Sequence, residues 1–130
     1  MDMEILFPGG KRVDAVYDGL RIRTDQSGYP GADETAPAPF DLFLASIGTC
    51  AGIYVLVFCQ KRGIPTEGLK LVQRAERSAQ SGMIDKIRIE IQLPHGFPEK
   101  YRKAVVRAAE LCTVKKHLQD PPGFEIYTSP

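Results

Sequence analysis

Three cysteines, Cys50, Cys59 and Cys112, are the side chains of this 130-residue sequence best suited to covalent chemistry. Their number is odd and their spacings are wide, which favours free thiols in a reducing, cytoplasmic compartment over a disulfide framework. The sequence has no CxxC or HxxxH pattern, and its two histidines, His95 and His117, lie far apart. We therefore expect no metal site. No glycine-rich phosphate loop is present either, and we expect no cofactor.

A lone cysteine is most often a small hydrophobic core residue, so chemistry at any of these thiols needs further support. Cys59 follows Cys50 by nine residues in one expected helix, which turns it about half a turn away. We expect Cys59 to fill the core. His117 falls near the end of another expected helix and is expected to be a surface residue.

The composition limits the classes of partner. Lys and Arg number 17 against 16 Asp and Glu, a formal net charge of +1, and the charges are spread along the chain. Nucleic acid and anionic membrane surfaces are therefore not expected partners. The length and the 43% hydrophobic content suit one domain, which we expect to cover residues 1–130.

The hydrophobic pattern predicts an α+β fold with antiparallel strands. Pro-Gly-Gly and Asp-Gly separate the first three short apolar runs, as in hairpins. Later, Ile87, Ile89 and Ile91 alternate with charged residues, which is typical of a strand with one wet face. The expected strands cover residues 3–7, 12–17, 20–24, 69–77, 84–93 and 124–128.

Two helices are expected. The first is long and apolar, from Phe40 to Arg62, with Gly63 as its stop signal. Its uncharged stretch, residues 42–60, is long enough to span a membrane. The other segments are amphipathic, however, and would have no core to cover without it, so we expect a buried central helix. The second helix begins at Pro98, and its apolar stripe ends at Cys112.

The sequences around two of the cysteines are specific. Residues 38–50, APFDLFLASIGTC, resemble the pattern P-x-E-L-L-L-A-S-L-G-x-C of the OsmC/Ohr family of osmotically inducible and organic-hydroperoxide-resistance proteins. Residues 108–118, AAELCTVKKHL, resemble the second motif of that family, a cysteine followed by Pro-Val and then Leu after an Ala-rich helix. The order of the expected elements also fits, so the resemblance covers nearly the whole chain.

The resemblance implies a fold and an activity. The fold would have antiparallel sheets wrapped around the long central helix, in an intertwined homodimer. The activity would be reduction of organic hydroperoxides, with Cys50 as the peroxidatic thiol, Cys112 as the resolving thiol and an external dithiol as reductant. Because Thr113 and Val114 follow Cys112, that residue is expected to begin a fresh helical segment whose N–H groups favour its thiolate.

A peroxidatic cysteine must ionise, and an ordinary thiol, with a pKa of about 8.5, is mostly protonated at neutral pH. In the family, an arginine from the N-terminal strands, oriented by a carboxylate, supplies the positive charge. Arg12 is our first candidate for this role, and Arg21 and Arg23 stay open. Asp41 stands where many relatives have Glu. It lies about 13 Å along the helix from Cys50, so we expect it to serve the thiolate of a partner subunit.

Two other classes of function stay open. One is a non-catalytic protein of the same fold that binds a small apolar molecule, and the other is a structural dimer with inert cysteines. The peroxidase interpretation predicts a disulfide between Cys50 and Cys112 after exposure to a hydroperoxide. The two alternatives predict none.

Overall fold

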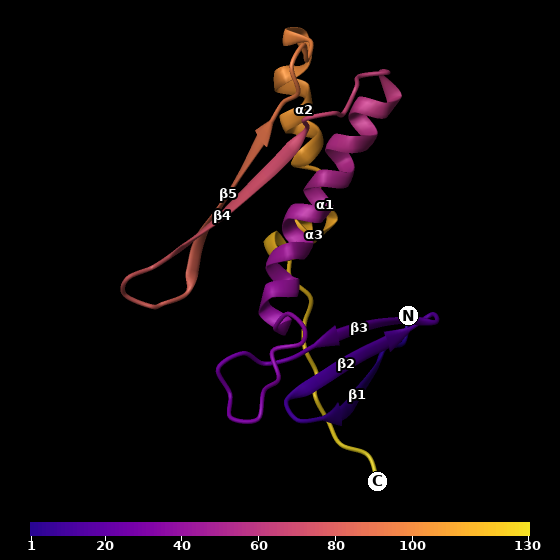
Figure 1. Cartoon of the computed structure of the whole chain (residues 1–130), viewed down its shortest axis with the longest axis vertical. Coiled ribbons are helices and arrows are strands. Elements are labelled where there is room, and N and C mark those ends of the chain that lie inside the picture. The colour runs from indigo at the N-terminus through magenta and orange to yellow at the C-terminus, as the bar shows by residue number, and fades with distance from the viewer. The chain divides into compact units, whose positions relative to one another are not determined.

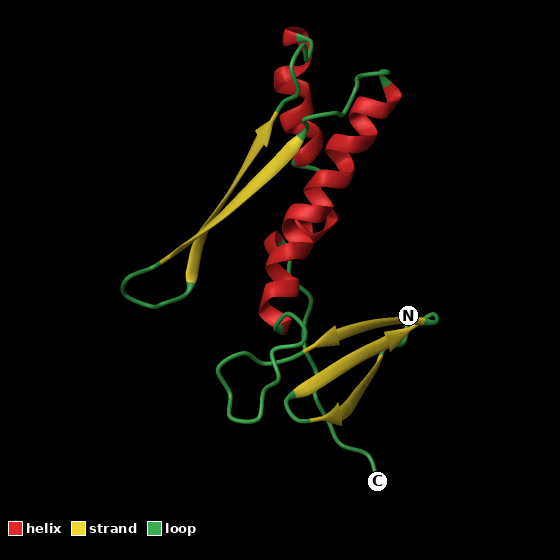
Figure 2. Ribbon diagram, in the orientation of Figure 1, coloured by secondary structure: helices red, strands yellow, loops and turns green.

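The computed structural model describes all residues, 1–130, and divides the chain into two compact units, Met1–Ala45 and Ser46–Pro130. Figure 1 labels the helices and strands, and Figure 2 colours them by type. Helices and antiparallel sheets are both present, which confirms the expected α+β class. The expectation of a single domain stays a prediction.

The first unit is built on a three-stranded antiparallel sheet in the order β1-β2-β3. The strands are β1 (Glu4–Gly9), β2 (Arg12–Tyr17) and β3 (Leu20–Thr24). The turn between β2 and β3 places both Asp18 and Gly19 at positive φ, 47° and 75°, as an Asp-Gly hairpin requires. β2 and β3 have their predicted bounds, whereas β1 was expected at residues 3–7 and instead continues through Pro8 and Gly9, which were expected in the turn.

A buried carboxylate holds the loop after β3. Asp25 is 1% exposed. Its Oδ1 accepts a hydrogen bond from the Gln26 N–H at 2.8 Å, and its Oδ2 accepts from the N–H and the hydroxyl of Thr35, both at 3.2 Å. Led by the bonds from the Gln26 and Thr35 N–H groups, these interactions outweigh burial and lower the pKa of Asp25.

Protonation of Asp25 is expected to destabilise the fold at acid pH. Because its pKa is lowered in the folded state, its contribution is complete above the unfolded pKa of about 3.9 and is lost as the pH falls through the lower folded value. We expect Asp25→Asn to unfold at a lower temperature than the wild type near neutral pH, with a difference that shrinks below about pH 4. Melting curves across this range, with the exposed turn variant Asp18→Asn as control, test this; a pH-independent difference would contradict it.

Helix α1 (Pro39–Lys61) runs close to its predicted bounds. Asp41 accepts a hydrogen bond from the Ala38 N–H at 3.2 Å in the first turn. At the other end, Gly63 has a φ of 62° and the Ile64 N–H bonds to the Cys59 carbonyl at 3.0 Å, which is a glycine C-terminal cap. By length and composition alone α1 could cross a membrane, a test that the core helix of a soluble protein also passes.

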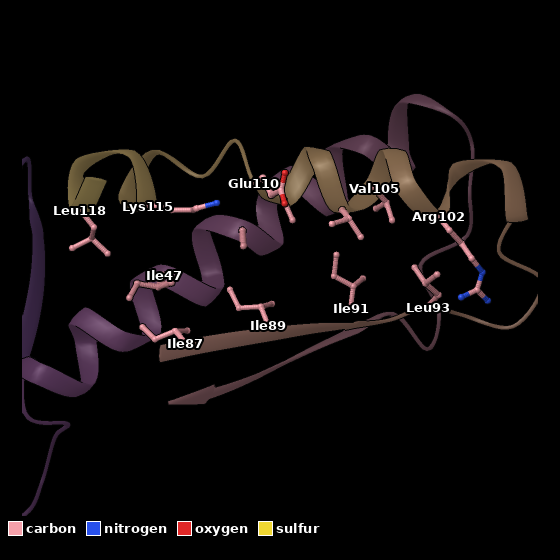
Figure 3. Close-up of a pocket in the computed structure, with 13 residues that line it drawn as sticks. Ile47, Ile87, Ile89, Ile91, Leu93, Arg102, Val105, Glu110, Lys115 and Leu118 are labelled. Atoms are coloured by element: carbon pink, nitrogen blue, oxygen red, sulfur yellow. The ribbon is translucent and has the colours of Figure 1, made fainter. Parts of the chain in front are cut away.

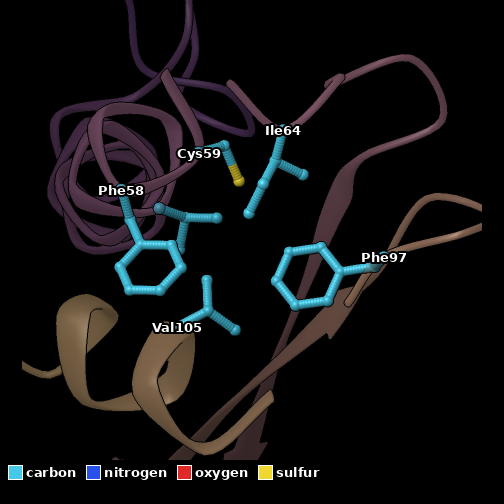
Figure 4. Packing of buried hydrophobic residues seen from close by; sticks show 6 residues of the cluster. Phe58, Cys59, Ile64, Phe97 and Val105 are labelled. Atoms are coloured by element: carbon cyan, nitrogen blue, oxygen red, sulfur yellow. The ribbon is translucent and has the colours of Figure 1, made fainter. Parts of the chain in front are cut away.

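The second unit contains the hairpin of β4 (Lys70–Arg77) and β5 (Ile84–Gln92). Leu71 pairs with Ile91 and Ala75 with Ile87, so one face of the hairpin is mostly apolar, as the alternation predicted. Side chains from α1, α2 and the segments next to the hairpin form the core, shown in Figure 4. Its buried members are Val55, Phe58, Cys59, Ile64, Phe97 and Val105.

The segment after the hairpin differs from the single helix expected from Pro98 to Cys112. It forms a 3₁₀ turn η1 (Glu99–Tyr101), α2 (Arg102–Ala109) and then α3 (Thr113–Gln119). The helical conformation is interrupted just before Cys112. The Cys112 sulfur accepts a hydrogen bond from the Lys115 N–H at 3.4 Å and so caps α3. The expectation that Cys112 begins a fresh helical segment is therefore confirmed.

The strand expected at residues 124–128 is absent, and this prediction was wrong. Phe124, Ile126 and Tyr127 are 89%, 95% and 80% exposed. A strand needs a neighbouring backbone for its N–H and C=O groups, and neither of the two sheets includes this segment. Alternation of apolar residues alone could not supply that neighbour.

Candidate active site

Cys50 and Cys112 lie together in the second unit, although 62 positions separate them in the sequence. Cys50 is partly exposed on α1, and Cys112, 2% exposed, begins α3. The Cys112 thiol lies near enough to the Cys50 sulfur to lower its pKa, and both cysteines are free thiols. The fold therefore brings together the two cysteines that the sequence motifs singled out.

The Cys50 thiol is the more acidic of the pair. Burial raises its pKa, but hydrogen bonds from the Val114 N–H, the Cys112 thiol and the Thr113 N–H together outweigh burial and lower the pKa below its usual value. The two backbone donors belong to the first turn of α3, where N–H groups have no partner within the helix. A thiolate at this position accepts bonds that would otherwise go to water.

The pKa of Cys112 shifts in the opposite direction, above its usual value. Burial raises its pKa most; the bond from the Lys115 N–H lowers it, but the hydrogen bond and the negative charge of Cys50 raise it further. Its Sγ also donates weakly to the Ile47 carbonyl oxygen at 3.9 Å. The N–H groups at the start of α3 therefore favour the Cys112 thiolate, as expected, but burial and the neighbouring Cys50 outweigh them and leave the pKa of Cys112 raised.

The first turn of α3 was missed as a part of the site. Sequence reasoning placed Cys50 in mid-helix and sought only a cation to ionise it, whereas Thr113 and Val114 provide backbone donors. The Tyr54 hydroxyl, one turn after Cys50 on α1, hydrogen-bonds to the Thr113 hydroxyl at 3.2 Å and ties the start of α3 to α1. The signal available in the sequence was the helix start at Cys112 itself.

Cys59 lies in different surroundings from this pair. It is fully buried among the core side chains, as predicted. Burial raises the pKa of Cys59, and the positive charge of Arg62 offsets this only in part. Its thiol is therefore expected to stay protonated and unreactive.

An apolar pocket of about 540 Å³ lies in the second unit and includes two residues whose backbone groups contact Cys112. Figure 3 shows Ile87, Ile89 and Ile91 of β5 opposite Val105 of α2, with Ile47 of α1 and Lys115 of α3 near one end. The last two residues also provide the backbone groups that contact Cys112. The pocket therefore reaches the surroundings of Cys112 and is large enough for a small apolar molecule.

The chain matches the family of OsmC-like proteins over residues 31–126, a range that includes both cysteines and spans most of the chain. The chain belongs to the OsmC-like protein family. The resemblance inferred from the two motifs is thereby confirmed. No curated protein matches this OsmC-like chain in sequence.

Solved structures share the OsmC-like fold at low sequence identity. A Psychrobacter arcticus protein described as a candidate osmotic stress induced and detoxification response protein matches with a TM-score of 0.71 and 20% identity, over 88% of this chain and 85% of its own. The OsmC-like protein of Mycoplasma pneumoniae matches with a TM-score of 0.70 and 15% identity, over 92% of this chain and 87% of its own. An organic hydroperoxide resistance protein OsmC from Legionella pneumophila matches with a TM-score of 0.55 and 18% identity, over 92% of this chain and 90% of its own.

The charged residues expected to assist Cys50 in this OsmC-like chain belong to the first unit. Asp41 caps its own helix, as described above. Arg12 donates from Nε to the Gly9 carbonyl oxygen at 3.3 Å, and the register of β2 and β3 places Arg21 and Arg23 on the same sheet face as Arg12. Which of these arginines acts on Cys50, and whether Asp41 serves a partner subunit, stay predictions.

Proposed function

We propose that this OsmC-like chain is a thiol-dependent peroxidase that reduces organic hydroperoxides, with Cys50 as peroxidatic and Cys112 as resolving cysteine. The observation that carries the proposal is the pair of neighbouring thiols at the start of α3, each of which shifts the pKa of the other. The lower pKa belongs to the more exposed thiol and the higher pKa to the buried one. This order suits an attacking thiolate on Cys50 and a second thiol that waits until the first is oxidised.

In the first step the Cys50 thiolate attacks the terminal oxygen of the hydroperoxide. An S–O bond forms and the O–O bond breaks, so the sulfur is oxidised and the alkoxide leaves. The alkoxide takes a proton and departs as the alcohol, and Cys50 becomes a sulfenic acid. The N–H groups of Thr113 and Val114, which lower the pKa of Cys50, stabilise the thiolate before attack.

In the second step Cys112 attacks the oxidised Cys50 sulfur. Once Cys50 is a neutral sulfenic acid, the negative charge that raised the Cys112 pKa is gone, so Cys112 ionises more readily. An S–S bond forms, the S–O bond breaks, and the hydroxide leaves as water with the proton released from Cys112. An external dithiol then reduces the disulfide and restores both thiols.

The apolar pocket favours an organic peroxide as substrate. Its lining is dominated by isoleucine, leucine and valine side chains, which bind an alkyl or aryl group by removing it from water. Hydrogen peroxide has no such group. We therefore propose that the organic part of the substrate lies in this pocket while the peroxide group reaches Cys50.

We also propose that the protein forms a homodimer. Ile53 and Val57, one turn apart on α1, are 51% and 36% exposed and form an apolar stripe that a partner subunit would cover. In such a homodimer, Asp41 and Arg12 are the residues we propose for orienting and activating charge at the thiol site. Reset of the disulfide by a dithiol suits a reducing, cytoplasmic location.

Turnover is expected with a dithiol as the sole reductant. With dithiothreitol present, the protein should consume cumene hydroperoxide catalytically, with a kcat/KM at least about tenfold above that for hydrogen peroxide because of pocket binding. Peroxide loss in a colorimetric assay measures this, with the Cys59→Ser variant expected to retain most of the activity. Stoichiometric loss without turnover, or no loss, would instead favour a binding or structural role.

A further inference from the structure

A second pocket, of about 380 Å³, lies wholly within the first unit on the β1-β2-β3 sheet. It is notable for three arginines among its lining residues. The lining comprises Pro8, Arg12, Asp14, Arg21, Arg23, Thr24, Thr35 and Ala36. The proposed peroxidase chemistry uses at most one of these arginines, so the cluster calls for its own explanation.

Strand register explains why these arginines gather. Arg12 and Asp14 are two residues apart on β2 and therefore share a face. Arg23 of β3 pairs directly with Asp14. Arg21 precedes Arg23 by two residues on β3 and therefore lies on the same face. The sequence thus directs three guanidinium groups and one carboxylate to one side of the sheet that Figure 1 labels β1 to β3.

The charges of this arginine pocket do not balance. Asp14 is the only carboxylate in the lining; it is 5% exposed and forms an ion pair with Arg21, Nε to Oδ2, at 3.3 Å. Arg12 donates only to the Gly9 carbonyl, and no ion pair involves Arg12 or Arg23. Two positive charges therefore remain uncompensated.

The position of Arg12 is also constrained by a glycine. Gly9 has a φ of 137°, and a Cβ built on it would lie 3.3 Å from Nη2 of Arg12. The absence of a side chain at residue 9 lets the guanidinium lie against the backbone of the β1–β2 turn. The Arg12 fork is thus held near the pocket rather than moving freely in solvent.

We propose that the arginine pocket binds a phosphate group, either as inorganic phosphate or as a phosphate monoester. Such an anion carries between about −1.5 and −2 charges near neutral pH, which matches the two uncompensated arginines. Guanidinium groups bind phosphate oxygens through paired, charge-assisted hydrogen bonds. The inference does not rest on the peroxidase proposal, because it involves neither thiol and shares only Arg12 with the proposed peroxidase site.

Isothermal titration of the full chain tests this binding. At low ionic strength, where screening is weak, inorganic phosphate should bind saturably at one site per chain, with a dissociation constant below about 10 mM. Arg23→Gln should weaken binding at least about tenfold, since each charge-assisted bond contributes on this scale. Arg12→Gln, a second exposed variant, should do the same.

The matched control is Arg88→Gln, an exposed strand arginine of the second unit that pairs with Glu76. It should leave phosphate binding unchanged, and melting curves establish that each variant folds. If glycerol 2-phosphate binds with the same affinity as inorganic phosphate, a phosphate monoester is the ligand. If only inorganic phosphate binds, the ligand is the free anion. Absence of saturation, or equal weakening by Arg23→Gln and Arg88→Gln, would overturn the proposal.

Discussion

Cys50→Ser is expected to reduce hydroperoxide turnover by at least about a thousandfold, because the variant has lost its nucleophile. A serine hydroxyl has nearly the same size, so it occupies the same place at the start of α3. It does not ionise in the physiological range, and the hydrogen bonds from Thr113 and Val114 cannot change that. The measurement is the steady-state rate with cumene hydroperoxide and dithiothreitol.

The control for this substitution is Cys59→Ser, which makes the same chemical change at a buried core position. We expect it to lower stability, because a hydroxyl is buried in an apolar cluster, while turnover by the folded protein stays within about threefold of the wild type. If Cys59→Ser abolished turnover and Cys50→Ser did not, the assignment of the peroxidatic cysteine would be wrong.

Cys112→Ser is expected to separate the two chemical steps. Without the resolving thiol, Cys50 should react once with peroxide and then remain a sulfenic acid, because no neighbouring sulfur can displace the hydroxyl. A serine oxygen can still accept the Lys115 N–H that caps α3, so the donors around Cys50 should keep their places. The trapped species can be detected as a dimedone adduct by mass spectrometry.

The rate of a single round of oxidation in the Cys112→Ser variant tests whether Cys50 reacts without Cys112. With no reductant present, oxidation of Cys50 should proceed within about threefold of the wild-type rate, whereas intramolecular disulfide formation should be lost completely. Failure of Cys50 to be oxidised in a folded Cys112→Ser variant would contradict the division of roles. Persistence of an intramolecular disulfide would point to Cys59 as the resolving thiol.

Local sequence patterns predicted much of the fold because the corresponding structure is decided locally. The alternation of Ile87, Ile89 and Ile91 with charged residues places β5 with one apolar face, and Gly63 ends α1 because it adopts a positive φ. These features depend on neighbours in sequence. The Cys50 and Cys112 motifs likewise predicted the pair that the fold brings together.

The remaining features depend on tertiary contacts that no local pattern contains. The break between α2 and α3 at residues 110–112 has no proline or glycine to mark it, so one helix was expected. The direction of the Cys112 pKa shift follows from its burial and from the charge of Cys50, and both arise only once α3 meets α1. The absent strand at residues 124–128 shows the same limit, since pairing requires a neighbour.

Peptide mapping of the protein after an equimolar dose of cumene hydroperoxide tests the central claim most directly. Digestion under non-reducing conditions, followed by mass spectrometry, identifies which cysteines become joined. We expect one intramolecular disulfide between Cys50 and Cys112, with Cys59 recovered as a free thiol. Recovery of all three cysteines in reduced form, or a disulfide that includes Cys59, would contradict it.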